Sequence, residues 1–389
     1  MRISTALLVR LYFIFSLLML TVAACFNMQS MEGNDEGGNW ELYTAFLAFM
    51  VWLAALLLPV LPGYDTYKPA PPILLYAAFL IWTVFPTLMS KQYSMAMSLF
   101  IITTPLLVLL STYNTARHMG SHKWFIAAFC LMLLILSVQY FRVFNFFNLL
   151  DADAHLVSSY YTLYMLPLVF LCKKKTVRIV ASLVVTVVII SSMKRSGVVA
   201  LMAAIVVFIF VNQFVAKKLK ASTIIGSFIA LVLFVVLFLV MANMGEESVL
   251  ERFENIGDDN GSGRLAVWEV TIKLISRLDF GSLLMGNGYN TVVTHSPFNL
   301  SAHNDFLEVI YDYGLIGLFL FVAAMLTTFF YALKMVVDKW PMAPSMAMLL
   351  TIFLIQSMIS HIIIYYWGSI YMLTSAYLIG AYVHDASNE

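Results

Sequence analysis

Long apolar runs alternate with short polar stretches along almost the whole chain. An α-helix needs roughly 20 apolar residues to cross a bilayer, and about 12 runs approach that length. They cover approximately 11–24, 42–61, 72–90, 94–112, 124–141, 156–172, 179–193, 198–215, 222–243, 306–333, 343–364 and 368–383. The pattern predicts an all-α polytopic integral membrane protein with about 12 transmembrane helices. The runs 179–193 and 368–383 are short, so we expect them to be tilted or incomplete spans.

Composition supports this class of protein. Of the 389 residues, 62% are hydrophobic and 11% are charged, and the mean hydropathy is +0.89. A soluble domain could not bury so much apolar surface, and a disordered chain would be far more polar. The net charge of +1 and the lack of a basic tail do not indicate a nucleic-acid partner. The three cysteines lie in apolar stretches, which favours neither a disulfide framework nor a metal site.

The N-terminal run has two interpretations. Arg2 and Arg10 precede it, and it ends in Val22-Ala23-Ala24-Cys25, a pattern that resembles a cleavable signal. Because many further apolar runs follow, an uncleaved first helix is the simpler prediction.

The distribution of Lys and Arg predicts the orientation. With the N-terminus inside, the densest basic clusters, 173–178 and 217–220, fall on the cytoplasmic side, and most carboxylates fall outside. Both termini are then cytoplasmic. Three regions follow: helices 1–9 in residues 1–243, a large periplasmic loop at 244–305, and helices 10–12 in residues 306–389.

The loop 244–305 is the longest polar segment, and chemistry is expected there. Within it, Arg264 to Leu278 is predicted to form an amphipathic helix that can lie along the membrane surface. The apolar residues at helical spacing are Leu265, Trp268, Ile272, Ile275 and Leu278.

Cations occur at two places on the predicted outer side. Lys194 and Arg195 lie between the seventh and eighth runs, where the positive-inside trend disfavours them. They indicate either an anion site or a local reversal or snorkelling pair. Arg264 follows a glycine-rich tripeptide at a helix start and has a guanidinium fork suited to phosphate. The alternative for Arg264 is a surface pair with Glu269 or Asp259.

His303 lies where the long loop enters the tenth run, and Asn304 can cap the helix that follows. The partial positive charge of a helix N-terminus lowers the pKa of a nearby imidazole, so His303 is predicted to be neutral and able to accept a proton. The same dipole favours an anion such as a pyrophosphate. A hydrogen-bonded structural histidine is the alternative.

An acidic stripe follows His303. Asp305, Glu308 and Asp312 are spaced three and four residues apart and so share one helical face. Asp312 lies about 10 Å deeper than Asp305 and must be paired or face water. Arg195 and Arg264 are the partners that the sequence offers.

Two glycines come next, Gly314 and Gly317, whose spacing lets a neighbouring helix pack closely. Two other histidines are weaker candidates: His361 as a structural polar contact and His295 as a loop residue. The sequence contains no metal-ligand spacing, nucleotide loop or Ser/His/Asp elbow, so no metal or cofactor is expected.

Taken together, these motifs resemble a known group. His303-Asn304, nine residues and then Gly314-Leu315-Ile316-Gly317 are similar to a signature of the O-antigen ligase and polymerase superfamily of bacterial envelope glycosyltransferases. Arg264 resembles the long-loop arginine of that family, and Arg195 resembles its arginine between two spans. Lys194 stands where the family has a small residue. The resemblance covers about residues 190–320.

The resemblance implies a GT-C-like helical fold in the bacterial inner membrane with a periplasmic active site. It implies transfer of a glycan from undecaprenyl pyrophosphate to a hydroxyl acceptor, without metal, cofactor or nucleotide sugar. His303 would activate or orient the acceptor, and Arg264, Arg195 and Lys194 would bind the pyrophosphate. The supporting residues would be Asn304, Asp305, Glu308, Asp312, Gly314 and Gly317.

The acceptor separates two activities within the family. Polymerases use a second lipid-linked repeat unit, with a chain-length regulator as a further partner, and ligases use lipid A–core. The shared motifs do not distinguish the two, and we predict a polymerase with a ligase as the alternative. A lipid-linked glycan flippase or other transporter is the rival class, because twelve spans with both termini inside would also suit a carrier.

Overall fold

The computed structural model describes residues 5–30, 38–57, 69–90, 95–143, 157–192, 194–216, 264–361 and 368–388. Apart from turns and connecting loops, these residues form helices throughout. The helices are α1 (Thr5–Ser30), α2 (Gly38–Leu57), α3 (Pro71–Met89), α4 (Met95–Met119), α5 (Lys123–Val143), η4 (Val157–Ser159), α6 (Tyr160–Val169), α7 (Lys175–Ser191), α8 (Arg195–Ala216), α11 (Arg264–Ser276), α12 (Phe280–Met285), α13 (Thr291–His295), α14 (Asp305–Val337), α15 (Ala343–Ile359) and α16 (Gly368–Asn388).

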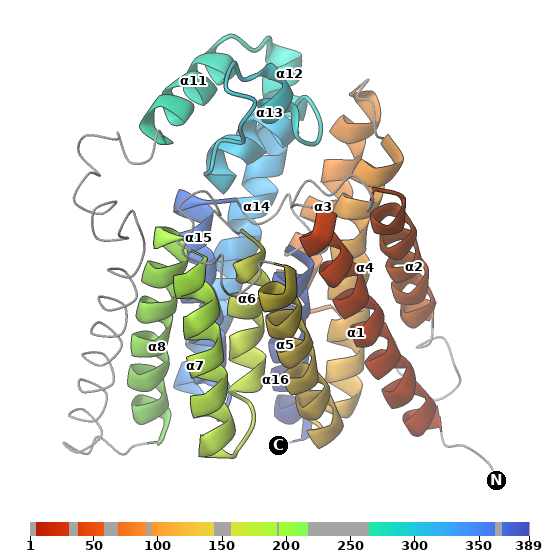
Figure 1. The fold of residues 1–389 in the computed structure, drawn as a ribbon, viewed down its shortest axis with the longest axis vertical. Coiled ribbons are helices and arrows are strands. Elements are labelled where there is room, and N and C mark those ends of the chain that lie inside the picture. Colours follow the sequence, from red (N-terminus) through yellow and green to blue (C-terminus); the bar gives the residue numbers. More distant parts are fainter. Residues whose placement is uncertain are drawn as a thin grey trace.

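The long helices form an upright bundle, and the three short helices α11, α12 and α13 lie above one of its ends (Figure 1). The start of α1 and the end of α16 lie at the opposite end. The turn between α6 and α7, which carries Lys173–Lys175, lies there too. The bundle therefore has one end with basic turns and another that carries the long loop.

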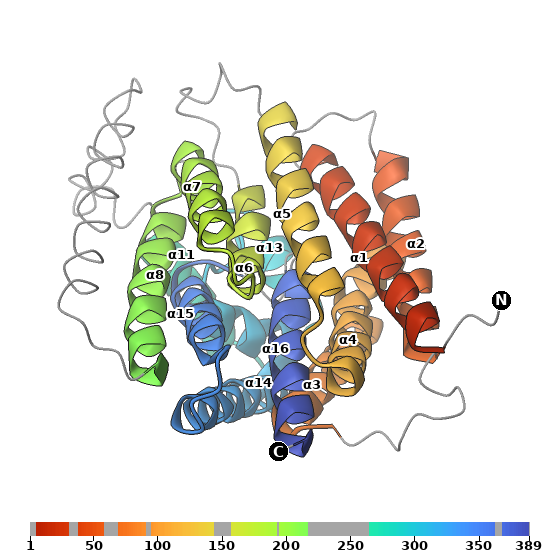
Figure 2. The same ribbon diagram turned by 90° about the horizontal axis from the view of Figure 1, so that it is seen from below.

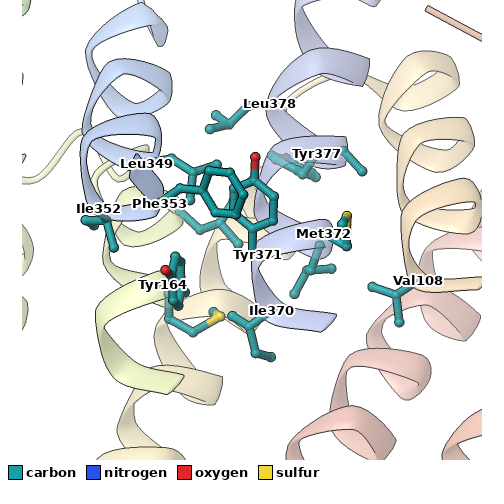
Figure 3. Packing of buried hydrophobic residues seen from close by; sticks show 14 of the residues in the cluster. Val108, Tyr164, Leu349, Ile352, Phe353, Ile370, Tyr371, Met372, Tyr377 and Leu378 are labelled. Atoms are coloured by element: carbon teal, nitrogen blue, oxygen red, sulfur yellow. The ribbon is translucent and has the colours of Figure 1, made fainter. Parts of the chain in front are cut away.

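Helix α16 lies inside the bundle (Figure 2) and packs most extensively against α4, while α15 packs on α8 and α14 packs on α3. The backbone of α16 approaches α4 closely, because a Cβ at Gly380 would lie 2.7 Å from the Tyr113 carbonyl oxygen. On the same helix, the Tyr371 ring stacks on the Phe353 ring of α15 at a centroid distance of 4.0 Å (Figure 3). The Tyr371 hydroxyl is hydrogen-bonded to the Tyr76 hydroxyl of α3 (2.6 Å). Aromatic packing and hydroxyl pairs thus hold this core together.

Six of the described helices are long and apolar enough to cross a membrane: Ala6–Met28, Pro71–Met89, Ser98–Met119, Lys123–Val143, Ser196–Ala216 and Asp305–Val337. Two shorter apolar helices, Tyr43–Leu56 and Ala343–Ile359, accompany them. The predicted all-α membrane class is confirmed in this coarser form. The count of about 12 spans stays a prediction, and the run 222–243 lies outside the described residues.

Several predicted boundaries differ from the observed helices; α1 and α4, for example, continue to Ser30 and Met119, beyond runs predicted to end at 24 and 112. The run 156–172 contains only a ten-residue α-helix, α6, preceded by the single 3-10 turn η4. All ten residues of α6 are buried, so its unbroken apolarity reflects a position inside the bundle rather than a full crossing. The run 368–383 is longer than expected, since α16 continues to Asn388.

Candidate active site

His303 occupies a sharp turn directly before α14. Its φ of 49° lies in the left-handed region, which histidine adopts more readily than most residues with a side chain. Asn304 then caps the helix: its side-chain oxygen accepts hydrogen bonds from the amides of Phe306 (3.0 Å) and Leu307 (3.1 Å). The predicted cap is therefore present, and His303 stands just outside the helix N-terminus.

Two tethers hold the backbone on either side of His303. The Glu308 carboxylate accepts a hydrogen bond from the amide of Ala302 (2.6 Å), and the Asn304 side-chain amide donates to the Met358 carbonyl oxygen (3.0 Å). The first tether ties the turn to α14, and the second ties it to α15. A left-handed conformation costs on the order of 1–3 kcal/mol at a residue with a side chain, and these bonds offset that cost.

His361 lies against His303. It follows α15, is only 5% exposed, and its ring stacks on the His303 ring at a centroid distance of 5.0 Å and an interplanar angle of 28°. Its Nδ1 shares a hydrogen bond of 2.8 Å with the Ser301 hydroxyl. The sequence indicated only a structural polar contact for His361, yet its partners are His303 and the loop residue two positions before it.

Both imidazoles are held neutral. Burial, Arg264 and Lys194, in that order, lower the pKa of His303 to about 4. Burial and the same neighbourhood hold the pKa of His361 well below its usual value. The predicted lowering of the His303 pKa has the expected direction, and burial is its largest cause, ahead of Arg264 and Lys194.

The two cations whose charges act on His303 lie about 70 residues apart in the chain. Arg264 is the first residue of α11 and is half-buried, and Lys194 directly precedes α8. Arg195 begins α8, but its side chain lies outside the described part of the structure. Glu269, one alternative partner for Arg264, is bonded to Lys273 (2.5 Å), and the other, Asp259, lies outside the described residues.

The start of α8 is fixed by a residue that sequence reasoning missed. The Tyr160 hydroxyl and the Ser196 hydroxyl are hydrogen-bonded at 2.7 Å. A Cβ at Gly197 would lie 3.4 Å from the Tyr160 ring and 3.2 Å from Ile189. Tyr160 thereby packs against the residues that follow Lys194. No spacing in the sequence relates it to them, because Tyr160 lies in a separate apolar run.

The acidic stripe is present, and Asp305, Glu308 and Asp312 are all fully buried. Asp312 does not have Arg264 among its partners, contrary to the expectation from sequence. Its carboxylate instead accepts four hydrogen bonds from the loop: Asn290 N (2.8 Å), Thr291 N (3.1 Å), Val292 N (3.1 Å) and Thr291 Oγ1 (2.6 Å). It caps the short helix α13 and so fixes the loop.

Gly314 breaks α14 into a loop-side segment, Asp305–Tyr313, and a distal segment, Leu315–Val337. Its φ of 70° and ψ of −175° are not helical. A Cβ there would lie 2.3 Å from the Leu284 carbonyl oxygen, because the end of α12 crosses at this point. At Gly286 a Cβ would likewise lie 2.3 Å from the Asp312 carbonyl oxygen. Two backbones therefore touch where neither carries a side chain.

The break leaves backbone carbonyl groups of α14 without their helical hydrogen bonds, and neighbouring residues donate hydrogen bonds to them instead. The Tyr311 carbonyl accepts from the Asn287 amide (3.2 Å), and the Asp312 carbonyl accepts from the Gly288 amide (2.8 Å). The Tyr313 carbonyl accepts from the Trp82 indole of α3 (2.8 Å). A Cβ at Gly317 would lie 3.3 Å from Trp82, so the expected close approach of a neighbouring helix occurs at Gly317.

The predicted amphipathic helix is α11, Arg264–Ser276, which ends two residues before the predicted end at Leu278. Its packed residues include Leu274, Ile275 and the following Leu278, which contact the cluster around Val292, Ala302 and Tyr311. Leu265 and Ile272, which belong to the predicted apolar face, are exposed. The helix thus covers the loop-side segment with only part of that face.

The arrangement combines a neutral proton acceptor with cations that favour an anion, while two of the three stripe carboxylates, Glu308 and Asp312, bind backbone amides. Within the described residues, no group of three or more His, Cys, Asp or Glu side chains is placed to hold a metal ion. Such a site suits an anionic substrate with a hydroxyl to be activated nearby.

One comparison with known proteins gives a match. A family model described as O-antigen ligase matches residues 180–322, a region that runs from α7 to the first part of the distal segment of α14. It includes Lys194, Arg195, Arg264 and His303. No curated protein sequence matches the chain.

Proposed function

We propose that the protein transfers a glycan from undecaprenyl pyrophosphate to a sugar hydroxyl, because its residues 180–322 match the O-antigen ligase family model. The single observation that carries this proposal is the state of His303. A buried neutral imidazole beside Arg264 and Lys194 can accept a proton where a diphosphate is bound.

The chemistry follows from these groups. His303 takes the proton of the acceptor hydroxyl, or orients that hydroxyl, as its oxygen attacks the anomeric carbon. The new C–O bond forms while the bond to the diphosphate oxygen breaks, and the electron pair leaves with the diphosphate. Direct displacement inverts the anomeric carbon.

The cations act on the leaving group. Arg264, Arg195 and Lys194 bind the diphosphate and stabilise the charge that develops on it, an effect worth roughly 2.7–4 kcal/mol per well-placed donor in other enzymes. The charge comes to rest on phosphate oxygens, so the step requires neither a strong general acid nor a metal ion.

The two ends of the bundle fit an orientation in the bacterial inner membrane. The end with basic turns would face the cytoplasm with both termini, and the end with α11–α13 and His303 would face the periplasm. The partners are then the lipid-linked oligosaccharide, an acceptor, the bilayer and a chain-length regulator.

We favour a polymerase, which would extend O-antigen, capsule or exopolysaccharide with a second lipid-linked repeat unit as acceptor. A ligase that uses lipid A–core is the second candidate, and the match to an O-antigen ligase family favours it.

A product assay tests the proposal. Purified protein is reconstituted in liposomes with its undecaprenyl-pyrophosphate repeat unit alone, and then with lipid A–core added. A ladder of longer lipid-linked glycans from the repeat unit alone identifies a polymerase, and transfer only with lipid A–core identifies a ligase. If no glycosidic bond forms while the substrate crosses the bilayer, the protein is a transporter instead.

Two variants test the assigned residues. His303→Ala should lower turnover by about 10²–10⁴-fold while lipid binding is kept. His295→Ala is the matched control, since His295 lies in the same loop but is hydrogen-bonded to the Tyr311 hydroxyl (2.7 Å).

Arg264→Lys keeps the charge but loses the bidentate fork, so most activity should disappear. The control Arg277→Lys changes an exposed arginine beyond the end of α11. Normal turnover in either site variant would contradict its role.

A further inference from the structure

We propose that His361 is a positioning residue that fixes the orientation of the His303 ring, a role that rests on the proposed function of His303. The proposal stands on three observations: a stacked ring pair, a hydrogen bond to Ser301, and the burial of His361.

His361 contacts the turn at two points. Its ring covers one face of the His303 ring at 5.0 Å, and its Nδ1 is hydrogen-bonded to the hydroxyl of Ser301, two residues earlier in the same turn. Both contacts come from the residue that follows α15, a helix packed against α8 and α14. The bundle therefore supports the His303 ring from outside the long loop.

The two backbone hydrogen bonds described above do not fix the orientation of the His303 ring. The bonds from Ala302 to Glu308 and from Asn304 to Met358 restrain the backbone around His303. They do not restrain rotation about the side-chain torsions of His303, and χ2 of an imidazole is a broad torsion. A flat ring stacked on one face limits that rotation. Productive geometry tolerates only small errors, since a displacement of about 1 Å can cost on the order of 100-fold in rate.

Burial distinguishes His361 from a surface contact. The side chain is 5% exposed and is held neutral by its surroundings, so it can pack face to face with a second neutral imidazole. No step of the proposed reaction uses His361, and its neighbours in the stack and in the hydrogen bond belong to the turn that carries His303.

Three variants separate the ring from the hydrogen bond. His361→Phe keeps a flat ring and loses the bond to Ser301, His361→Asn keeps a polar group and loses the ring, and Ser301→Ala loses only the bond. Reconstituted protein is assayed for kcat and KM with the lipid-linked repeat unit, with and without lipid A–core. We expect His361→Asn to lower kcat by about 10–100-fold with KM within twofold of the unmodified protein, and His361→Phe and Ser301→Ala to stay within about fivefold.

A purely structural role gives another pattern. Equal losses in His361→Phe and His361→Asn, or a wild-type kcat in His361→Asn, would overturn the proposal. A second measurement does not depend on catalysis: the ¹⁵N-histidine spectrum in nanodiscs, with the His303 signal assigned by its loss in His303→Gln. That signal should shift or broaden in His361→Asn and stay in place in His361→Phe, and an unchanged signal in His361→Asn would overturn the role. If the unmodified protein forms no glycosidic bond, the proposed function fails, while the spectrum still decides whether His361 holds the ring.

Discussion

The loop-side segment of α14 and its distal segment belong to one helix but are built differently. Before Gly314, the side chains of Asp305, Glu308 and Asp312 are buried, and the last two bind backbone amides of the loop. After it, large apolar side chains face outward, with Phe319 70% and Phe330 62% exposed. A buried polar group that loses its hydrogen-bond partner costs about 1–3 kcal/mol, whereas an exposed apolar side chain that faces lipid contributes little to packing. Substitutions should therefore have large effects before the break and small effects after it.

Among the variants that test this comparison, the largest effect on stability is expected from Gly314→Ala, which changes the boundary between the two segments. The backbone conformation of Gly314 is one that essentially only glycine adopts, so a Cβ costs about 1–3 kcal/mol there, and overlap with Leu284 adds about 1–3 kcal/mol. Transfer activity should fall more than tenfold, and the midpoint of thermal unfolding in detergent should drop. Gly281→Ala is the control, because Gly281 lies in α12 with only the Asp279 side chain close by (3.1 Å). Equal behaviour of both variants would contradict the account of the break.

Asp312→Asn should come next. An amide keeps one acceptor oxygen but turns an NH₂ group toward the loop amides, so we expect about 2–4 kcal/mol of destabilisation and roughly tenfold lower activity. The matched control is Asp279→Asn, since Asp279 also caps a short helix, through Ser282 N (3.0 Å), but is exposed. Asn caps a helix as well as Asp does. Thermal unfolding of both variants checks the prediction, and a silent Asp312→Asn would show that the loop needs no charged cap.

A smaller effect on stability, together with a specific effect on the pH profile, is expected from Lys194→Met. In the unmodified protein, kcat/KM should stay constant as the pH falls until it nears the His303 pKa of about 4, because His303 must be neutral to accept a proton. Removal of the Lys194 charge raises that pKa, so the acid limb should move to higher pH. Lys273→Met, which changes an exposed lysine, should leave the limb in place. The measurement is a profile of kcat/KM between pH 4 and 8 for each variant. An acid limb that stays in place in Lys194→Met would show that the Lys194 charge does not lower the pKa of His303.

The smallest effect is expected in the distal segment. Phe319→Leu and Phe330→Leu keep an apolar surface toward the surroundings, so stability should change by less than about 0.5 kcal/mol and activity by less than twofold. The same assays apply. A large loss in either variant would mean that this face has a binding partner, and the contrast between the two segments would then disappear.

Most helices could be predicted because a long run of apolar residues indicates a helix whose side chains must be removed from water. The cap at Asn304 was predicted from local spacing, since it depends on residues within one helical turn. The length of α6 was not, because a fully buried helix and a membrane span have the same apolar pattern.

The site was predictable only where its parts share a short motif. His303 and Asp312 belong to one such motif, yet the role of Asp312 depends on loop residues about 20 positions earlier, to which no periodicity connects it. The stack of His361 on His303 joins residues from different elements, and so does the bond between Tyr160 and Ser196. Contacts of this kind arise from the packing of the bundle, and neither helical periodicity nor the distribution of charge along the sequence predicts that packing.

The break at Gly314 also sets the depth of α14 in a bilayer. At about 1.5 Å per residue, Leu315–Val337 is roughly 34 Å long, close to the hydrocarbon thickness of about 30 Å. The loop-side segment does not prolong this span, because the Phe306 ring lies 5.6 Å from the Phe321 ring and the chain therefore bends back at Gly314. The turn that carries His303 is thereby held nearer to the span than a continuous helix would place it. Under the proposed function, a lipid diphosphate anchored by its own tail would need to diffuse in only two dimensions to reach this turn.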